Sequence, residues 1–240
     1  MNTNLVLSLQ NVSVRYGTKD VLKNISLKVQ RGVFYALIGL NGSGKTTLFK
    51  SLTNTIAYTG KIYLENEDIK TLNAKQLAKK ICLLSQHNTI YAPLTVWEVV
   101  LMGRYPYTSV WQNYSQKDID ICHEALKTTQ TDMFKDKKIH HLSGGEAQRV
   151  WLAQKIAQDT PILLLDEPTQ HLDIKQKHLF FNLLNDILQN KVKTVLMSTH
   201  DLEELHRLNG HIWHCNNQSV EVVENYTSKD IENLKQKLLQ

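Results

Sequence analysis

The sequence predicts an α/β fold in which a mostly parallel β-sheet is joined to an antiparallel β subdomain and interrupted by an inserted α-helical subdomain. Three observations lead to this prediction. Short apolar runs of strand length alternate with helical segments, as in parallel sheets with right-handed crossovers. Residues 5–29 instead alternate apolar and polar side chains, as half-buried strands do. A helical pattern from about residue 87 to residue 158 separates two groups of predicted strands.

The first part of the chain is predicted to be rich in strands. Alternating apolar side chains begin at Leu5 and continue to Val29. The uninterrupted apolar run over 33–38 is typical of a central strand that is buried on both faces. A glycine-rich turn follows it, and then a helix over 45–51. Further strands are expected from Gly60 and over 81–85.

The middle of the chain is predicted to be helical. Helix starts in this region carry a hydroxyl residue followed three positions later by an acidic residue, which is the pattern of a capping box. These pairs are Thr95 with Glu98, Ser115 with Asp118, and Ser143 with Glu146.

Strands return after the helical segment, over 162–165, 194–198 and 211–215. A helix over 174–188 separates the first two of these strands, and Leu183 and Ile187 lie on one of its faces. The tail from Ser228 to Gln240 is expected to form a polar helix.

Composition limits the classes of protein that the chain can represent. Of its 240 residues, 42% are hydrophobic and 21% charged, which suffices for a packed core and excludes wholesale disorder. The formal net charge of +5 is too small to indicate a nucleic-acid partner, and we expect none. Three widely spaced cysteines are typical of a reducing compartment. Since neither a secretory signal nor a membrane-spanning stretch is visible, we expect a cytosolic protein that can dock on a membrane protein.

The segment from Gly39 to Thr46 has the pattern GxxxxGK[ST] of a phosphate-binding loop, or P-loop. It follows a predicted strand and opens a predicted helix, which is the context that this pattern requires. Glycines let successive backbone N–H groups converge on phosphate oxygens, and the helix N-terminus adds partial positive charge. We expect Lys45 to reach the β- and γ-phosphates of a nucleotide and the Thr46 hydroxyl to ligate Mg²⁺.

A complementary pair of carboxylates, Asp166 and Glu167, ends the strand over 162–165. We expect Asp166 to hold Mg²⁺ through its water shell, and Glu167 to face the γ-phosphate and polarise the attacking water. Together with the P-loop, this pair predicts a nucleotide hydrolase or transferase. The class stays open at this point, because small-molecule kinases, GTPases, helicases and transporter motors share both elements.

The segment from Leu142 to Arg149, Leu-Ser-Gly-Gly-Glu-Ala-Gln-Arg, narrows this choice. Its two glycines at a helix start expose N–H groups and the positive end of the helix dipole, which makes a second anion site. Here the chain resembles the ATP-binding-cassette (ABC) family, whose signature is LSGGQ or LSGGE. The resemblance covers about residues 5–225, and it implies that the signature contacts ATP held by the opposite subunit of a head-to-tail dimer.

The resemblance also implies roles for single residues. Gln86 matches the glutamine that senses Mg²⁺ and the membrane subunit, and His200 matches the switch histidine on the γ-phosphate. Asp173 matches the D-loop aspartate, although it can also cap the following helix, and Tyr16 lies where the family stacks an aromatic ring on adenine. The implied catalytic residues are Glu167, His200, Lys45 and Gln86, and the implied metal ligands are Thr46, Gln86 and Asp166. The implied ATP-binding residues are Tyr16, Gly39, Asn41, Gly42, Ser43, Gly44, Lys45, Thr46, Thr47, Asp166, Ser143, Gly144, Gly145, Glu146 and Asp173.

Two further segments resemble one subclass of the family. A histidine precedes Leu172-Asp173, and Gly103-Arg104-Tyr105-Pro106-Tyr107 lies in the helical insertion. Both are similar to the ATPase subunits of importers for iron–siderophores, haem and cobalamin. The resemblance then implies integral membrane permease subunits as partners, a periplasmic or lipoprotein substrate-binding protein as an indirect partner, and a peripheral position on the cytoplasmic face of the membrane.

The domain prediction is a single ABC ATPase domain over 1–240. Residues 1–86 and 159–225 form the nucleotide-binding core with its β subdomain, residues 87–158 the helical subdomain, and residues 226–240 a C-terminal helix. Two alternatives stay open at this stage. One is a soluble ABC ATPase, such as one for Fe–S assembly, and the other is a P-loop small-molecule kinase, which would have no use for the segment from Leu142 to Glu146.

Overall fold

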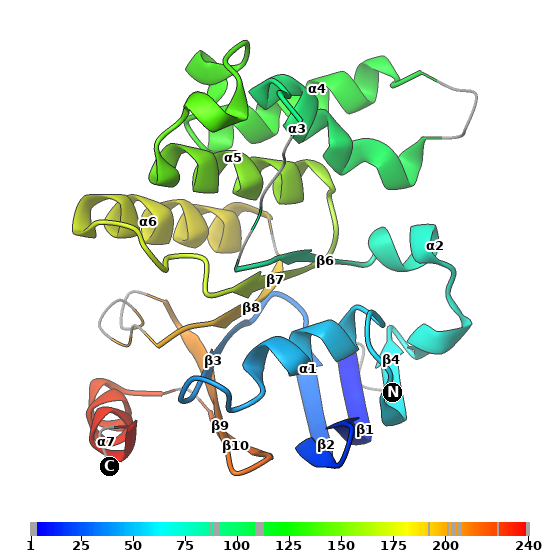
Figure 1. Cartoon of the computed structure of the whole chain (residues 1–240), viewed down its shortest axis with the longest axis vertical. Helices are drawn as coiled ribbons and strands as arrows, with labels where there is room; N and C mark the ends of the chain where they lie inside the picture. Colours follow the sequence, from blue (N-terminus) through cyan, green and yellow to red (C-terminus); the bar gives the residue numbers. More distant parts are fainter. Residues whose placement is uncertain are drawn as a thin grey trace.

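A computed structural model describes residues 4–86, 88, 92–108, 113–191, 193–200, 202, 205, 208–224 and 226–238. Its elements form three layers: an antiparallel sheet, a mostly parallel sheet and a group of helices at the far end (Figure 1). The predicted fold class is confirmed, and its layers fix where each candidate site residue lies.

The antiparallel sheet has the strand order β2-β1-β4-β5. It is built from alternating sequence, so that one face is buried and the other meets solvent. The two long strands form a hairpin in which Tyr16 pairs with Lys19. The strands are β1 (Leu5–Tyr16), β2 (Lys19–Gln30), β4 (Thr59–Leu64) and β5 (Glu67–Asp68).

The second sheet has the order β10-β9-β3-β8-β7-β6, and all its neighbouring strands are parallel except β9 and β10. The central strands β3, β7 and β8 are buried along their whole length, as their continuous apolar runs predict. The strands are β3 (Phe34–Ile38), β6 (Ile81–Leu84), β7 (Ile162–Asp166), β8 (Thr194–Ser198), β9 (Gly210–Asn216) and β10 (Ser219–Val223).

Two hydrophobic cores cover the two faces of this sheet. On β3, Tyr35 and Leu37 belong to the core shared with the antiparallel sheet and α1 (Lys45–Leu52). Phe34 and Ala36, on the opposite face, belong to the core shared with α6 (Ile174–Lys191) and the helical layer. Successive side chains of a strand point to opposite faces, so one short strand anchors both cores.

The helical layer contains α3 (Val96–Leu101), α4 (Gln116–Thr128) and α5 (Gly144–Ala157). All three predicted capping boxes are confirmed, with both reciprocal hydrogen bonds present at Thr95, Ser115 and Ser143. The connecting segments contain short 3₁₀ turns, namely η2 (Met102–Tyr107), η3 (Asp132–Phe134) and η4 (Ile139–His141). Residues 87, 89–91 and 109–112, which the sequence places in this helical stretch, lie outside the described residues.

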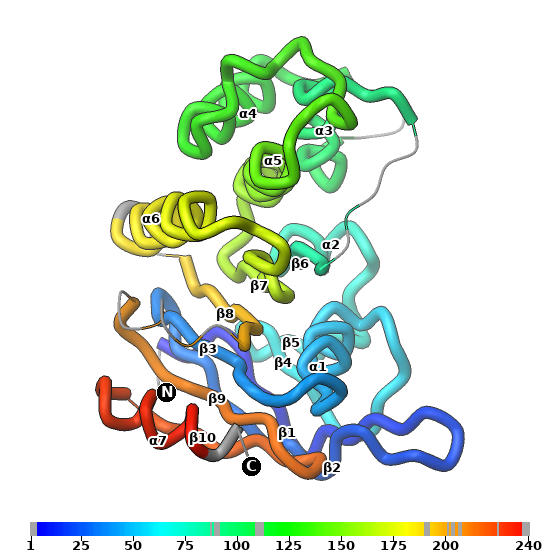
Figure 2. The backbone as a smooth tube through the Cα atoms, turned by 60° about the vertical axis from the view of Figure 1, so that its left-hand side comes forward, coloured from blue at the N-terminus to red at the C-terminus, as the bar shows by residue number. Residues whose placement is uncertain are grey.

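Several elements differ from the sequence-based expectation. The 3₁₀ turn η1 (Ile69–Thr71), helix α2 (Ala74–Ala78) and strand β10 were not predicted. The C-terminal helix α7 (Ser228–Leu238) is amphipathic rather than wholly polar, because Ile231 and Leu234 are buried in the core. Figure 2 shows it beside β9 and β10, at the end of the molecule opposite to α4. In the described part of the chain, no helix combines the length and the apolar character that crossing a bilayer demands.

Candidate active site

The P-loop connects the carboxyl end of β3 to the first residue of α1. Gly42 and Gly44 have φ values of 81° and 105°, backbone conformations that glycine adopts without steric cost. Gly44 is the N-cap of α1 and makes no side-chain cap, so the first N–H groups of the helix are left for a ligand. Thr46 and Thr47 lie in the first turn of this helix. The loop therefore has the backbone geometry of an anion site.

Cys215 of β9 packs against the P-loop. A Cβ added at Gly39 would lie 2.4 Å from the carbonyl oxygen of Cys215, so no larger residue fits there. The Cys215 thiol also lies 3.4 Å from the carbonyl oxygen of Ser43. Burial raises the pKa of this thiol to about 11, and the protonated form can donate to that oxygen.

The Lys45 side chain folds back over the P-loop. Its ammonium donates to the carbonyl oxygens of Gly39, at 2.9 Å, and Leu40, at 3.2 Å. It also lies 3.4 Å from Oε1 of Glu167, and both side chains are almost fully buried. Lys45 is thus directed into the loop and is already paired with the carboxylate that follows β7.

The two carboxylates at the end of β7 are held by Ser198, the last residue of the neighbouring strand β8. The Ser198 hydroxyl donates to Oδ1 of Asp166 at 2.5 Å. The backbone N–H of Glu167 donates to the same hydroxyl oxygen at 2.9 Å. Glu167 has a φ of 46°, a left-handed conformation that reverses the chain and turns its side chain toward Lys45. Parallel strands place their carboxyl ends on one edge, which is why these residues meet.

His200 completes this group from the segment after β8. Its Nδ1 lies 3.5 Å from Oε2 of Glu167, a buried oxygen that receives no hydrogen bond from the residues that the structure describes. The Glu167 carboxylate therefore sits between the Lys45 ammonium on one side and the His200 imidazole on the other. Three predicted site residues from three separate segments are brought together here.

Gln86 follows β6 on the same edge of the sheet. Its amide nitrogen donates to the side-chain oxygen of Gln170, in the segment between β7 and α6. This contact orients the Gln86 amide, and its carbonyl oxygen stays available as a ligand. A glutamine in a loop carries no pattern of its own, so only the family resemblance pointed to Gln86, and nothing pointed to Gln170.

The predicted metal ligands Thr46, Gln86 and Asp166 fit Mg²⁺ in their chemistry. They offer a hydroxyl, an amide carbonyl and a carboxylate, all oxygen donors of the kind that this hard cation prefers. Within the described ranges, no group of three His, Cys, Asp or Glu side chains could hold a metal ion without further ligands. One carboxylate supplemented by substrate phosphates is the usual way in which Mg²⁺ is bound.

The signature segment opens α5 in the helical layer, whereas the P-loop opens α1 on the other side of the sheet (Figure 1). Ser143 accepts from the N–H of Glu146, and the Glu146 carboxylate accepts from Ser143, which lowers the pKa of Glu146 below its usual range. A Cβ added at Gly144 would meet nothing within 4 Å, so this backbone is open to a ligand. No hydrogen bond or ion pair of the described chain joins 143–146 to 39–47. The predicted site is therefore divided into two separate parts.

The signature helix contacts the segment that follows Glu167. The Gln148 amide donates to the carbonyl oxygen of Pro168 at 2.8 Å, and Arg149 donates to the side chain of Gln176. Asp173 accepts from the N–H of Gln176 at 2.8 Å, which confirms that it caps the start of α6. No motif in the sequence assigns a role to Gln148, Arg149, Gln176 or Ser198. Polar residues within a few positions of a recognised motif are the only signal that could have pointed to them.

Tyr16 lies at the end of β1 and is half exposed. A groove of about 330 Å³ lies beside the P-loop and is lined by 40–43, 214–218 and the start of β2 from Lys19. Tyr16 itself is not among the lining residues, although its hairpin partner Lys19 is. The adenine-stacking role of Tyr16 stays a prediction.

The chain is similar in sequence to known proteins of one family. The family model of the ABC transporter matches residues 22–170. The petrobactin import ATP-binding protein FpuD of Bacillus anthracis is 36% identical over 197 residues, which cover 82% of this chain and 72% of that protein. The ferric enterobactin transport ATP-binding protein FepC of Escherichia coli (strain K12) is 34% identical over 204 residues, which cover 85% and 75%.

Solved structures give the same result. An inward-facing structure described as a metal-chelate type ABC transporter superposes with a TM-score of 0.83 at 25% identity, covering 97% of this chain and 90% of that one. The dimeric structure of a bacterial ABC transporter cassette superposes with a TM-score of 0.79 at 28% identity, covering 92% and 99%. The resemblance inferred from the motifs is confirmed: this chain belongs to the ABC transporter family and is one of its ATP-hydrolysing subunits.

Proposed function

We propose that this chain energises the uptake of an iron–siderophore complex through a membrane permease. The observation that carries the enzymatic part is the convergence of Lys45, Glu167 and His200 at one edge of the sheet. The substrate class is supported by the relatives, since the petrobactin and ferric enterobactin proteins are named for such transport. Haem and cobalamin, which the sequence also admits, are the rival substrates.

In this proposal each residue at the edge has a distinct role in hydrolysis. The N–H groups of 42–46 and the Lys45 ammonium receive the β- and γ-phosphates of ATP. Glu167 accepts the proton of the attacking water, and His200 donates to the γ-phosphate. The buried Glu167 carboxylate lies between the Lys45 ammonium and the His200 imidazole, and these contacts keep it close to where the water attacks.

Mg²⁺ would be held by Thr46, Asp166 and Gln86 together with the phosphates. When bound, it neutralises part of the phosphate charge that develops during transfer. The chain's own contribution is orientation. Ser198 fixes the Asp166 carboxylate by its hydrogen bond, and Gln170 fixes the Gln86 amide.

The proposed active unit is a head-to-tail dimer of this chain. The reason is that the backbone groups of Gly144 are exposed at the start of α5, away from the chain's own P-loop. A second copy would place these groups on the γ-phosphate held by the first, with Tyr16 on the adenine and Asp173 at the subunit boundary. The dimeric cassette among the similar structures supports this arrangement.

Permease subunits at the cytoplasmic face of the membrane are the proposed partners, with a substrate-binding protein acting on the far side. The proposed division of labour places nucleotide chemistry in 1–86 and 159–225 and permease contact in the helical part, 87–158. A soluble Fe–S assembly ATPase and a small-molecule kinase are not favoured. The kinase in particular offers no use for the segment from Leu142 to Glu146.

Uptake by cells tests the proposed substrate. A strain that lacks this chain is given the wild-type gene or the Glu167→Gln variant, and the uptake of radiolabelled ferric siderophore, haem and cobalamin is measured. We expect that only the wild type restores uptake, and only of the ferric siderophore. If the wild type restored uptake of haem or cobalamin alone, that compound would be the substrate and the proposed ferric siderophore would be wrong. Restoration by the Glu167→Gln variant would disprove the proposed role of hydrolysis.

The proposed dimer is tested by serial dilution of the purified chain. We expect ATPase activity per molecule to fall as the protein is diluted, because each nucleotide site needs residues of two copies. A constant specific activity down to concentrations at which the chain is monomeric by light scattering would contradict the shared site.

A further inference from the structure

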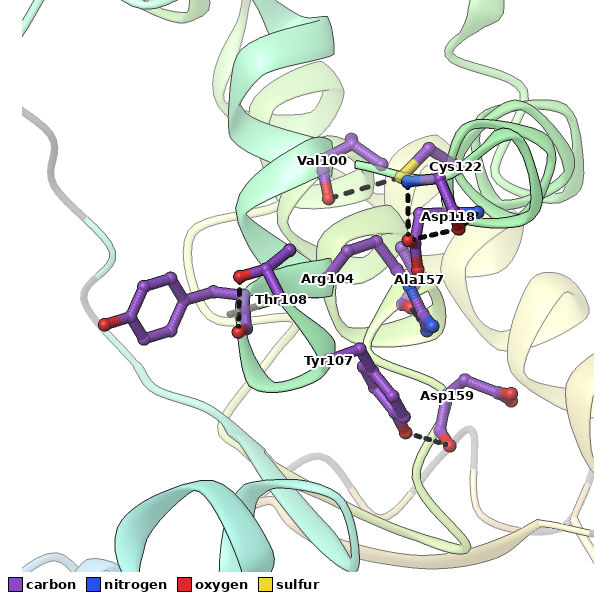
Figure 3. Close-up of polar contacts among 10 residues, drawn as sticks. Val100, Arg104, Tyr107, Thr108, Asp118, Cys122, Ala157 and Asp159 are labelled. Carbon is purple, nitrogen blue, oxygen red and sulfur yellow. Dashed lines mark hydrogen bonds and ion pairs between the residues drawn. The ribbon is translucent and has the colours of Figure 1, made fainter. Parts of the chain in front are cut away.

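The turn η2, which contains Gly103-Arg104-Tyr105-Pro106-Tyr107, has two unlike sides. Tyr105 is 64% exposed, and Met102 and Tyr107 are also exposed. Arg104, between them in sequence, is only 4% exposed and points into the helical layer (Figure 3). A buried arginine is rare unless its charge is paired, so its contacts decide what the turn is fixed to.

Arg104 joins η2 to two helices at once. Its Nε donates to Oδ1 of Asp118 in the first turn of α4, at 2.8 Å. Its Nη1 donates to the carbonyl oxygen of Ala157, also at 2.8 Å. The ring of Tyr107 lies over the guanidinium carbon, with 3.9 Å between that carbon and the ring centroid. The planar fork of arginine allows these contacts to form together, which a lysine could not reproduce.

Ala157 is the last residue of α5, the signature helix. The final carbonyl groups of a helix have no partner within the helix, and the dipole makes this end negative. Arg104 therefore caps the signature helix with a positive charge from a different segment. Asp118 is held in place for this pairing, because its other oxygen accepts from the hydroxyl of Ser115 at 2.6 Å.

Two further contacts press the turn against the same end of α5. A Cβ added at Gly103 would lie 2.3 Å from the carbonyl oxygen of Gln154, so only glycine allows this approach. The Tyr107 hydroxyl donates to the carbonyl oxygen of Asp159 at 3.3 Å. While these contacts are intact, η2 and the C-terminal end of α5 must move together.

The opposite end of α5 carries the signature. The helix has 14 residues, so a rigid rod of roughly 20 Å separates Ala157 from Ser143. A displacement imposed on the exposed side of η2 would thus reach Ser143–Gly145 through the helix axis. This transmission requires that Arg104 holds η2 against the C-terminal end of α5.

We propose that Arg104 is a positioning residue that fastens the exposed turn η2 to the C-terminal end of the signature helix, so that permease movement at Tyr105 shifts Ser143–Gly145. This inference rests on the proposed transport function. In this inference the Gly-Arg-x-Pro-Tyr segment links the permease mechanically to α5, and it contacts neither nucleotide nor substrate.

The test uses the complex of this chain with its permease in proteoliposomes, and compares ATP hydrolysed with substrate transported. The first variant, Arg104→Lys, keeps the charge and loses the fork. The second, Arg104→Met with Asp118→Leu, removes both charges and so avoids leaving one buried and unpaired. The matched control is Lys117→Met, an exposed residue next to Asp118 in α4. Thermal unfolding and the ATPase rate of the isolated chain are measured on all of them.

We expect both Arg104 variants to transport about tenfold less substrate per ATP, a typical size for a coupling between sites. The double variant and the control should keep the ATPase rate of the isolated chain. The control should also keep the unfolding midpoint, which the double variant should lower modestly, because Asp118→Leu removes the capping box at Ser115. Variants that transport as efficiently as the wild type would overturn the inference, as would a loss confined to variants that are also unfolded. A wild-type complex that transports nothing would instead disprove the transport function itself.

Discussion

The ammonium of Lys45 and the carboxylate of Glu167 lie 3.4 Å apart in the interior of the protein. The lysine that is expected to bind the phosphates is thus paired with the expected general base. In the proposed mechanism an incoming nucleotide would compete with Glu167 for Lys45 and, once bound, would free the carboxylate to act on water. The pairing would then link occupancy of the P-loop to activation of the base.

The Glu167→Gln variant should separate binding from hydrolysis. Glutamine cannot accept the proton of the attacking water, so hydrolysis should slow by about 10²- to 10⁴-fold. The amide carries no charge to compete for Lys45, so ATP should bind at least as tightly as to the wild type. Phosphate release and nucleotide-binding titrations measure the two effects, and gel filtration with ATP should show a persistent dimer. Hydrolysis at the wild-type rate would refute the role given to Glu167.

The Lys45→Met variant should lose affinity for ATP. Hydrogen bonds to charged groups contribute about 1.5–3 kcal/mol each, so the dissociation constant should rise by roughly 10- to 100-fold. Lys50→Met is the matched control, because Lys50 lies on the same helix and is exposed. Equal affinities of the two variants would show that Lys45 does not contact the phosphates.

The signature glycines should differ in their tolerance of alanine. Gly144→Ala meets open space, so stability should be retained while ATP-dependent dimerisation weakens, since the methyl group would stand where a phosphate approaches. Gly145→Ala meets the side chain of Gln176 at 2.6 Å and should also lower the unfolding midpoint. Adding Gln176→Ala should relieve this clash and restore part of the midpoint, because Arg149 loses its hydrogen-bond partner in the same step. If Gly144→Ala left dimerisation and ATPase activity intact, this surface would not be the second half of the site.

The stability of the folded protein should fall at alkaline pH because of two buried thiols, those of Cys122 and Cys215. Burial raises the pKa of Cys122 and of Cys215 to about 11, from an ordinary value of 9.0. A raised pKa means that the folded state favours the protonated thiol, so its contribution to stability is complete below pH 9.0 and declines as the pH rises towards 11. Chemical denaturation across this range should show the decline. Alkylation by iodoacetamide should be slow in the native protein and fast after unfolding, and rapid alkylation of the native protein would contradict the burial of these thiols.

Local interactions explain why much of the fold could be predicted. A capping box joins residues three positions apart, so Ser143 and Glu146 already specify the helix start that the structure contains. The same signal was present in Asn73 and Gln76, which form the capping box of the unpredicted α2. The apolar run of β3 and the P-loop pattern that follows it likewise depend only on neighbours in the chain.

The sequence alone determined the chemistry that this protein carries, namely a phosphate loop, an acidic strand end and a signature helix. Only the tertiary structure decided how these parts meet. Lys45, Glu167 and His200 come together because parallel strands align their ends, and Arg104 reaches Ala157 because two distant segments pack face to face. Such contacts join residues far apart in the chain, and their partners are selected by burial and by the shape of the packed core, for which no local pattern exists.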